Sequence, residues 1–317
     1  MSARIISKTF IKDLKEGILS PILRRVQNDE TLFLAIRKDY VNIYYRGGNI
    51  MKIQELGPEQ YSALFDKKYD HHKGGLPPLP AQLDTPDSVN VWVKSFPRIK
   101  EVMDFWFSDH PKLEREFQQV VARENNNSSV SNTTEYFITD VEFSDSEMGA
   151  RFDMLAIQWL RGKRKHGNTC RPALIEMKFG DSALGGGAGL LKHLQDFEMF
   201  ITDKERYKSL LETMTSQFDQ MRELGGLIRF GNNGNDYKAI PDETVRPEVV
   251  FLLANHNPDS TILNTFLINL TDDYVDSLHF DLRFFVANFA GYGLHEKSML
   301  TLAEFREHIN FVDNRKG

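Results

Sequence analysis

The stretch ALIEMKFGDSALGGGAGLLKHLQDF, Ala173–Phe197, combines a strand, a turn and a helix signal. It begins as an apolar strand that contains Glu176 and Lys178, continues through a glycine-rich turn, and ends with helical spacing. Residues two apart in a strand share a face, so the two charges are predicted to lie together. Burying either charge is unfavourable without a partner. An ion pair between them is the simplest interpretation.

A second acid, Asp153, lies inside another apolar segment, RFDMLAI. The two segments are joined by QWLRGKRKHGNTCR, which is predicted to form a long hairpin. Antiparallel pairing can then bring Asp153 near Glu176. Two close carboxylates repel each other unless a cation neutralises them. Mg²⁺ suits such a site because it prefers oxygen ligands and keeps several waters, and Mn²⁺ is an alternative.

The surrounding residues extend this hypothesis to a reaction. The main-chain carbonyl of Met177 can add a metal ligand, and Lys178 can orient the attacking water or stabilise charge on a phosphate. This combination of groups is typical of metal-assisted phosphodiester hydrolysis.

Asp153 followed by Glu176-Met177-Lys178 resembles the motif of the PD-(D/E)XK, or restriction-endonuclease-like, nuclease superfamily. The predicted order of helix, three strands, helix and strand over roughly residues 105–256 is similar too. One departure is Phe152, which stands where the motif has proline. The resemblance implies a Mg²⁺-dependent nuclease that acts on DNA in defence or repair, with Asp153 and Glu176 as metal ligands and Lys178 positioning the nucleophile.

The resemblance also implies an acid from the helix before the sheet and a polar residue in the helix after it. Glu116 is the first choice for the acid, with Glu114 and Glu142 as alternatives, and each could equally be a solvated charge. His193 is the candidate in the later helix, where it would contact a substrate phosphate or a water. An ion pair between His193 and Asp196 is the alternative.

The densest basic run, RGKRKHG, lies at the tip of the predicted hairpin. We predict that it contacts a nucleic-acid backbone through Arg161, Lys163, Arg164 and Lys165. Charged hairpin tips also serve solubility, and that alternative stays open.

Other site classes are excluded by spacing. The glycine run matches neither G-x-x-x-x-G-K-[ST] nor G-x-G-x-x-G, so it predicts a turn and not a phosphate loop. A G-x-S-x-G elbow is missing. His71-His72 has no cysteine or acidic ligand at zinc spacing.

The predicted fold class is α/β: a restriction-endonuclease-like core with a mixed central sheet flanked by helices, plus an N-terminal helix and a small antiparallel meander. We place the N-terminal module and its Pro/Gly-rich connector at residues 1–96 and the nuclease-like domain at 97–317. Helices are expected over residues 8–29, 97–124, 190–201 and 203–224. The expected meander spans residues 31–53, and core strands are expected over 135–143, 150–160, 172–179 and 247–256.

Composition sets the remaining limits. The chain has 317 residues, 41% of them hydrophobic, and a net charge of −6, which does not exclude a local basic surface. Cys170 is the single cysteine, and no apolar targeting segment opens the chain. These features predict a cytoplasmic protein without membrane contact, and the resemblance implies DNA as its partner; a homodimer stays open. Two rival hypotheses are a non-catalytic binding module and a structural ion-pair network.

Overall fold

The computed structural model describes residues 4–70, 75–128, 133–145, 149–164, 169–185, 189–229, 240–241, 244–255, 260–287, 294, 296 and 299–309. Packing divides the chain into two compact units. The N-terminal unit comprises residues 2–129 and 216–230, and the C-terminal unit comprises residues 130–215 and 231–317. The N-terminal unit therefore extends past residue 96, the predicted end of the first module.

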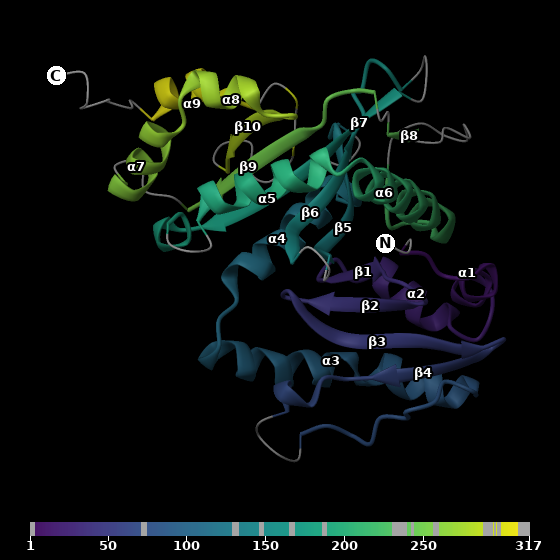
Figure 1. Cartoon of the computed structure of the whole chain (residues 1–317). Coiled ribbons are helices and arrows are strands. Elements are labelled where there is room, and N and C mark those ends of the chain that lie inside the picture. Colours follow the sequence, from purple (N-terminus) through teal and green to yellow (C-terminus); the bar gives the residue numbers. More distant parts are fainter. Residues whose placement is uncertain are drawn as a thin grey trace. The chain divides into compact units, whose positions relative to one another are not determined.

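The N-terminal unit contains a four-stranded antiparallel sheet in the order β1-β2-β3-β4 (Figure 1). Its strands are β1 (Leu32–Ile36), β2 (Tyr40–Tyr45), β3 (Gly48–Gly57) and β4 (Gln60–Leu64). The predicted meander is confirmed, and the structure adds β4. Its turns use Asp39 and Gly47, with φ values of 61° and 71°, a region that glycine and short polar residues tolerate best.

Two predicted helices are each divided in the structure. Residues 8–29 form α1 (Lys8–Lys15) and α2 (Ser20–Gln27), and Pro21 opens the second because it fits the first helical turn. Residues 97–124 belong to α3 (Pro86–Asp109) and α4 (Leu113–Asn126), which are separated before Pro111. Proline disfavours helical geometry in the residue before it, so His110 ends the helix.

The C-terminal unit is built on a mixed sheet in the order β10-β9-β7-β6-β5, with the two-residue β8 (Ile240–Pro241) beside β7. Its strands are β5 (Tyr136–Asp145), β6 (Ala150–Gln158), β7 (Thr169–Phe179), β9 (Glu248–Ala254) and β10 (Asp281–Val286). β5, β6 and β7 are antiparallel, whereas β7, β9 and β10 are parallel. The predicted α/β class with a mixed sheet is confirmed.

Helices α5 (Leu190–Thr202) and α6 (Lys204–Leu224) follow β7, and the first part of α6 belongs to this unit. Figure 1 shows α5 lying over the sheet. Phe152 of β6 stacks on Phe197 of α5 with ring centroids 4.8 Å apart, and Phe200 meets the same ring edge-on at 5.0 Å. These aromatic contacts fix α5 against β6.

The last part of the chain, which the sequence does not order, forms α7 (Thr261–Asn269), α8 (Asp272–Ser277), β10 and α9 (Leu302–His308). Phe284 of β10 contacts Phe266 of α7 and stacks on Phe305 of α9 at 4.5 Å. All seven residues of β9 are buried, so the strand expected over residues 247–256 is covered on both faces.

No helix in the described part of the chain is long and apolar enough to cross a membrane.

Candidate active site

The candidate site lies where β6 separates from β7. Their antiparallel ladder begins at Gln158–Arg171 and ends at Met154–Ile175. Beyond that pair, β6 continues beside β5 as far as residue 150, and β7 continues beside β9 as far as residue 179. Asp153 and Glu176 are the first residue on each strand past the last pair. The two predicted metal ligands therefore sit on opposite sides of a fork in the sheet.

A direct contact joins the two sides of the fork. The main-chain N–H of Met177 donates to Oδ2 of Asp153 at 2.8 Å. This carboxylate takes the place of a ladder acceptor, because a main-chain N–H inside a protein requires a partner. In an extended strand the N–H and C=O of one residue point to the same side. The Met177 carbonyl is therefore directed toward Asp153 as well.

Glu176 and Lys178 lie on one face of β7, as predicted. Nζ of Lys178 donates to Oε1 of Glu176 at 2.7 Å, and the side chains are only 7% and 3% exposed. The same Glu176 oxygen lies 2.9 Å from Nε2 of His193, which is 3.2 Å from Nζ of Lys178. Acid, base and imidazole thus form a closed triangle of contacts. The geometry places His193 with Glu176 and Lys178.

The alternative partner of His193 is engaged elsewhere. Asp196 forms an i,i+4 ion pair with Lys192 on α5. His193 is 16% exposed and lies on the side of α5 that meets β7. In the structure it therefore contacts Glu176 and not Asp196.

The three candidate upstream acids differ in position. Glu116 and Glu114 lie on α4 in the N-terminal unit. The Glu116 carboxylate is held by the Arg46 guanidinium through two contacts, Nε–Oε1 at 2.9 Å and NH2–Oε2 at 3.1 Å. This hydrogen bonding raises the pKa of Arg46 above its usual range. Glu116 thus already has a bidentate cationic partner in its own unit.

Glu142 belongs to the same unit as Asp153 and Glu176. It lies in β5 between the register pairs Val141–Met154 and Phe143–Phe152, which puts it across from Asp153. Its φ of 54° is unusual for a strand residue. Glu142, Asp153 and Glu176 therefore occupy neighbouring positions on three adjacent strands. Glu142 is thus the candidate acid that shares a sheet with Asp153 and Glu176, whereas the sequence analysis favours Glu116.

A buried acid without a motif signal lies nearby. Asp140 of β5 is fully buried, and its Oδ1 accepts from the N–H of Val141 at 2.8 Å. It follows Thr139, where the β5–β6 register shifts by one residue. A bulge disrupts the ladder at this point, and the Asp140 carboxylate accepts from a main-chain N–H beside it. Sequence spacing does not predict the bulge.

Among the residues that the structure describes, no group of three or more His, Cys, Asp or Glu side chains is arranged to hold a metal ion. The groups that would hold a cation at the fork are the carboxylates of Asp153 and Glu176 and the Met177 carbonyl. All are oxygen donors, and a partial protein shell of this kind fits Mg²⁺. Lys178 is the cationic partner of Glu176, and His193 contacts the same carboxylate oxygen.

The basic hairpin divides into two kinds of residue. Arg161 and Lys163 are exposed. Arg164 is 8% exposed; its guanidinium donates to the carbonyl of Trp159 at 3.0 Å and to that of Thr134, and lies 4.8 Å from the Phe137 ring centroid. Burial lowers the pKa of Arg164 to about 10. The prediction that Arg164 contacts nucleic acid is therefore contradicted by its burial. Lys165 and His71-His72 lie outside the described residues.

The glycine-rich turn has a structural explanation at two positions. Gly180 leaves β7 with a φ of 75°, which L side chains rarely adopt. A Cβ at Gly189, just before α5, would lie 2.9 Å from the Leu184 carbonyl oxygen. Both positions require glycine for backbone reasons, as expected for a turn.

Comparison with models of protein families, with curated proteins and with solved structures finds no match for this chain. The functional argument therefore rests on the site itself.

Proposed function

We propose that the protein is a Mg²⁺-dependent nuclease with a restriction-endonuclease-like core, and that it hydrolyses phosphodiester bonds of DNA. The observation that carries this proposal is the fork, where Asp153 contacts the Met177 N–H and the buried Glu176 contacts Lys178 and His193. Two carboxylates and a lysine at the end of a strand ladder support this proposal. DNA as the substrate rests on the resemblance.

Each group of the chain has a separate task in this proposal. Asp153, Glu176 and the Met177 carbonyl hold the cation, which when bound would supply Lewis-acid stabilisation of the phosphate. Lys178 orients the attacking water and stabilises negative charge on the phosphate. His193, beside Lys178, can accept a proton when its imidazole is neutral.

The reaction consumes one water for each bond cleaved. The water oxygen forms a bond to phosphorus while a bond from phosphorus to a sugar oxygen breaks. The electron pair of the broken bond stays on the leaving oxygen, which takes a proton, and the attacking water loses one. The products are a phosphate monoester end and a free hydroxyl end.

The test is cleavage of single-stranded DNA, duplex DNA and RNA by purified protein in Mg²⁺, Mn²⁺ or EDTA. Asp153→Ala and Lys178→Ala variants are compared with an Asp196→Asn control, because Asp196 pairs with Lys192 outside the triangle. We expect metal-dependent cleavage of DNA that falls at least ~100-fold in the first two variants and is retained in the control. Cleavage that persists in both Asp153→Ala and Lys178→Ala would sink the proposal.

One observation favours a structural ion-pair network instead. Glu176 already has the Lys178 ammonium as an ion-pair partner and His193 in contact without a metal ion. In that case neutralising Asp153 weakens the acceptor of the Met177 N–H and brings no change in metal affinity. A binding module on the same fold likewise predicts no metal affinity that depends on Asp153.

A further inference from the structure

A second polar site lies at the other edge of the same sheet. β7, β9 and β10 are parallel, so their amino-terminal ends meet at one edge. Arg171, Glu248 and Asp281 lie at these ends, whereas Glu176 and Lys178 lie toward the carboxyl-terminal end of β7. At about 3.3 Å per residue, Arg171 and Glu176 are ~16 Å apart along the strand. The two sites are therefore distinct.

A cavity of about 420 Å³ opens at this edge. Ligand pockets commonly have volumes of about 300–1,000 Å³. Four cationic and three acidic side chains line it, together with apolar groups that include Leu160, Val245 and Met299. The cations come from four separate segments: Lys163, Arg171, Arg246 and Arg283. The cavity lining therefore combines charged side chains with apolar ones.

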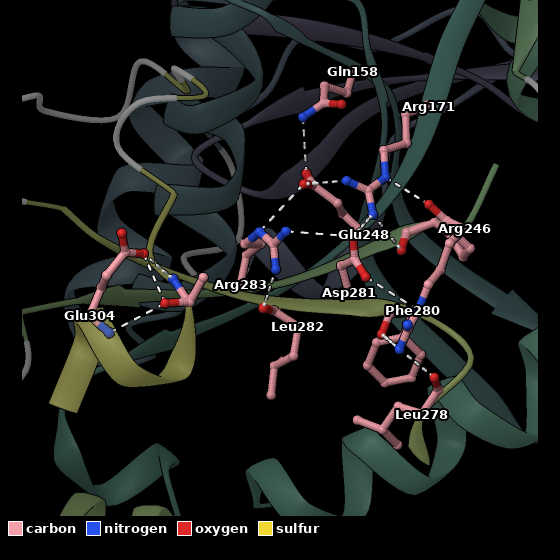
Figure 2. A network of polar contacts seen from close by, with 12 residues as sticks. Gln158, Arg171, Arg246, Glu248, Leu278, Phe280, Asp281, Leu282, Arg283 and Glu304 are labelled. Carbon is pink, nitrogen blue, oxygen red and sulfur yellow. Dashed lines mark hydrogen bonds and ion pairs between the residues drawn. The ribbon is translucent and has the colours of Figure 1, made fainter. Parts of the chain in front are cut away.

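Buried acids hold part of this wall in place. Oε2 of Glu248 accepts from the Tyr136 hydroxyl at 2.6 Å and from the Gln158 amide at 3.2 Å, while its Oε1 accepts from NH1 of Arg171 at 2.8 Å. Burial, reinforced by Glu248, raises the pKa of Tyr136 well above its ordinary value, so the hydroxyl stays a donor. The Glu248 carboxylate is thereby fixed from several sides (Figure 2).

Arg171 is committed to the protein. Its Nε donates to the Arg246 carbonyl at 2.7 Å, and its NH2 donates to the Pro247 carbonyl at 3.3 Å and to Asp281. Arg246 likewise donates to the carbonyls of Leu278 and Phe280. These two arginines shape the cavity and keep it positive, but have few donors to spare.

Arg283 and Lys163 are held less tightly. NH1 of Arg283 donates to the Leu282 carbonyl at 3.0 Å, whereas its Nε is 3.6 Å from Glu248 and its NH2 is 3.5 Å from Asp281, at or beyond the limit of a hydrogen bond. Figure 2 shows the Arg283 guanidinium beside both acids. The side-chain ammonium of the exposed Lys163 makes no hydrogen bond or ion pair within the described residues. Both side chains therefore have donors for a ligand.

We infer that this cavity binds a terminal phosphate monoester. A guanidinium fork and a separate ammonium suit the three oxygens of a phosphate, since arginine binds two oxygens and lysine acts as a point charge. The apolar wall of Leu160, Val245 and Met299 accommodates the body to which the phosphate is attached. That body is a nucleoside. It is either free, as in a nucleotide, or the 5′-terminal residue of a nucleic acid.

The test measures the unfolding temperature and ligand affinity of the full chain in EDTA at constant ionic strength, so that the fork holds no cation. The probes are inorganic phosphate, AMP, adenosine, and a short oligonucleotide with and without a 5′-phosphate. We expect saturable stabilisation by AMP and none by adenosine. A preference for AMP identifies a small ligand, and a preference for the 5′-phosphorylated oligonucleotide identifies a nucleic-acid end.

Variants locate the site. Lys163→Gln and Arg283→Gln should each weaken phosphate binding about tenfold, the effect of losing one charge-assisted hydrogen bond. Lys204→Gln, an exposed lysine on α6, and Asp153→Asn should bind as the unaltered protein does. Lys163 is exposed, so its variant keeps the fold even if Arg283→Gln does not. Stabilisation by none of the phosphate-bearing probes, or equal binding by Lys163→Gln and Lys204→Gln, overturns the inference.

Discussion

The carboxylate of Asp153 accepts a hydrogen bond from the main-chain N–H of Met177, at 2.8 Å; Asp153 lies one residue and Met177 two residues past the last pair of the β6–β7 ladder. A side chain therefore replaces the main-chain partner that β7 loses at this point. The contact fixes Asp153 beside Glu176-Met177-Lys178. A substitution at Asp153 should therefore alter the position and the metal affinity of the residues on β7.

The buried Glu176–Lys178 pair predicts strong energetic coupling. Lys178→Met should lower the free energy of unfolding by about 3 kcal/mol, since it leaves a buried carboxylate with His193 alone. The double variant, Lys178→Met with Glu176→Gln, should lose less unfolding free energy than the sum of the two single losses, by at least ~1 kcal/mol. Urea unfolding of the four proteins in the cycle measures this coupling. Strictly additive costs would show that the 2.7 Å contact contributes no coupling.

His193 should affect catalysis more than stability. Because the His193 side chain is partly exposed, His193→Gln should change the free energy of unfolding by no more than about 1 kcal/mol. DNA cleavage should fall about 100-fold, a typical loss for a proton-transfer group. Asp196→Asn on the same helix is the matched control. Equal cleavage by the two variants would remove His193 from the mechanism.

The basic hairpin should separate into a structural and a surface residue. Arg164→Ala leaves the carbonyls of Trp159 and Thr134 without their guanidinium donor and should cost about 2 kcal/mol of stability. Arg161→Ala, at an exposed position three residues earlier, should change stability by no more than about 0.5 kcal/mol. Thermal unfolding of both variants checks this difference. Similar losses in the two proteins would contradict the burial of Arg164.

Tyr45 gives a prediction for alkaline pH. Burial, together with the Asp104 carboxylate, raises the pKa of Tyr45 to about 12 from its ordinary value near 10. The neutral hydroxyl donates to Asp104 at 3.0 Å. A raised folded-state pKa stabilises the fold below the unfolded-state value, and this contribution is lost as the pH rises through about 12.

The difference in unfolding temperature between the unaltered protein and Tyr45→Phe should therefore be largest near pH 9 and shrink as the pH rises through 10 to 12. Comparing the two proteins cancels groups that titrate in both. A difference that stays constant across this range would show that Tyr45 has an ordinary pKa in the fold.

Sequence patterns predict the parts of the fold that local physics controls. The apolar runs around Asp153 and Glu176 give β6, β7 and their antiparallel hairpin, and β9 follows from its continuous apolar sequence. Helix breaks are predicted less well: Pro21 and Pro111 divide what periodicity alone joins. The fork between β6 and β7 has no sequence signal, because a ladder ends for reasons of three-dimensional packing.

The candidate site shows the same division. Spacing in β7 correctly pairs Glu176 with Lys178, and helical spacing brings His193 near them. The position of Glu142 across from Asp153 depends on a register shift at Thr139, which residue types alone do not indicate. The hydrogen bonds from Arg164 to two carbonyls cannot be predicted from the sequence either, since a basic hairpin sequence favours an exposed surface.

The most direct test of the nuclease hypothesis is a calorimetric titration of the protein with Mn²⁺ in the absence of substrate. Asp153→Asn keeps an acceptor for the Met177 N–H but removes the charge, so the fold should persist while Mn²⁺ affinity falls at least ~10-fold. Asp196→Asn should titrate like the unaltered protein. If Asp153→Asn binds Mn²⁺ as tightly as Asp196→Asn, then Asp153 and Glu176 do not share a cation, and the fork is not a metal-dependent active site.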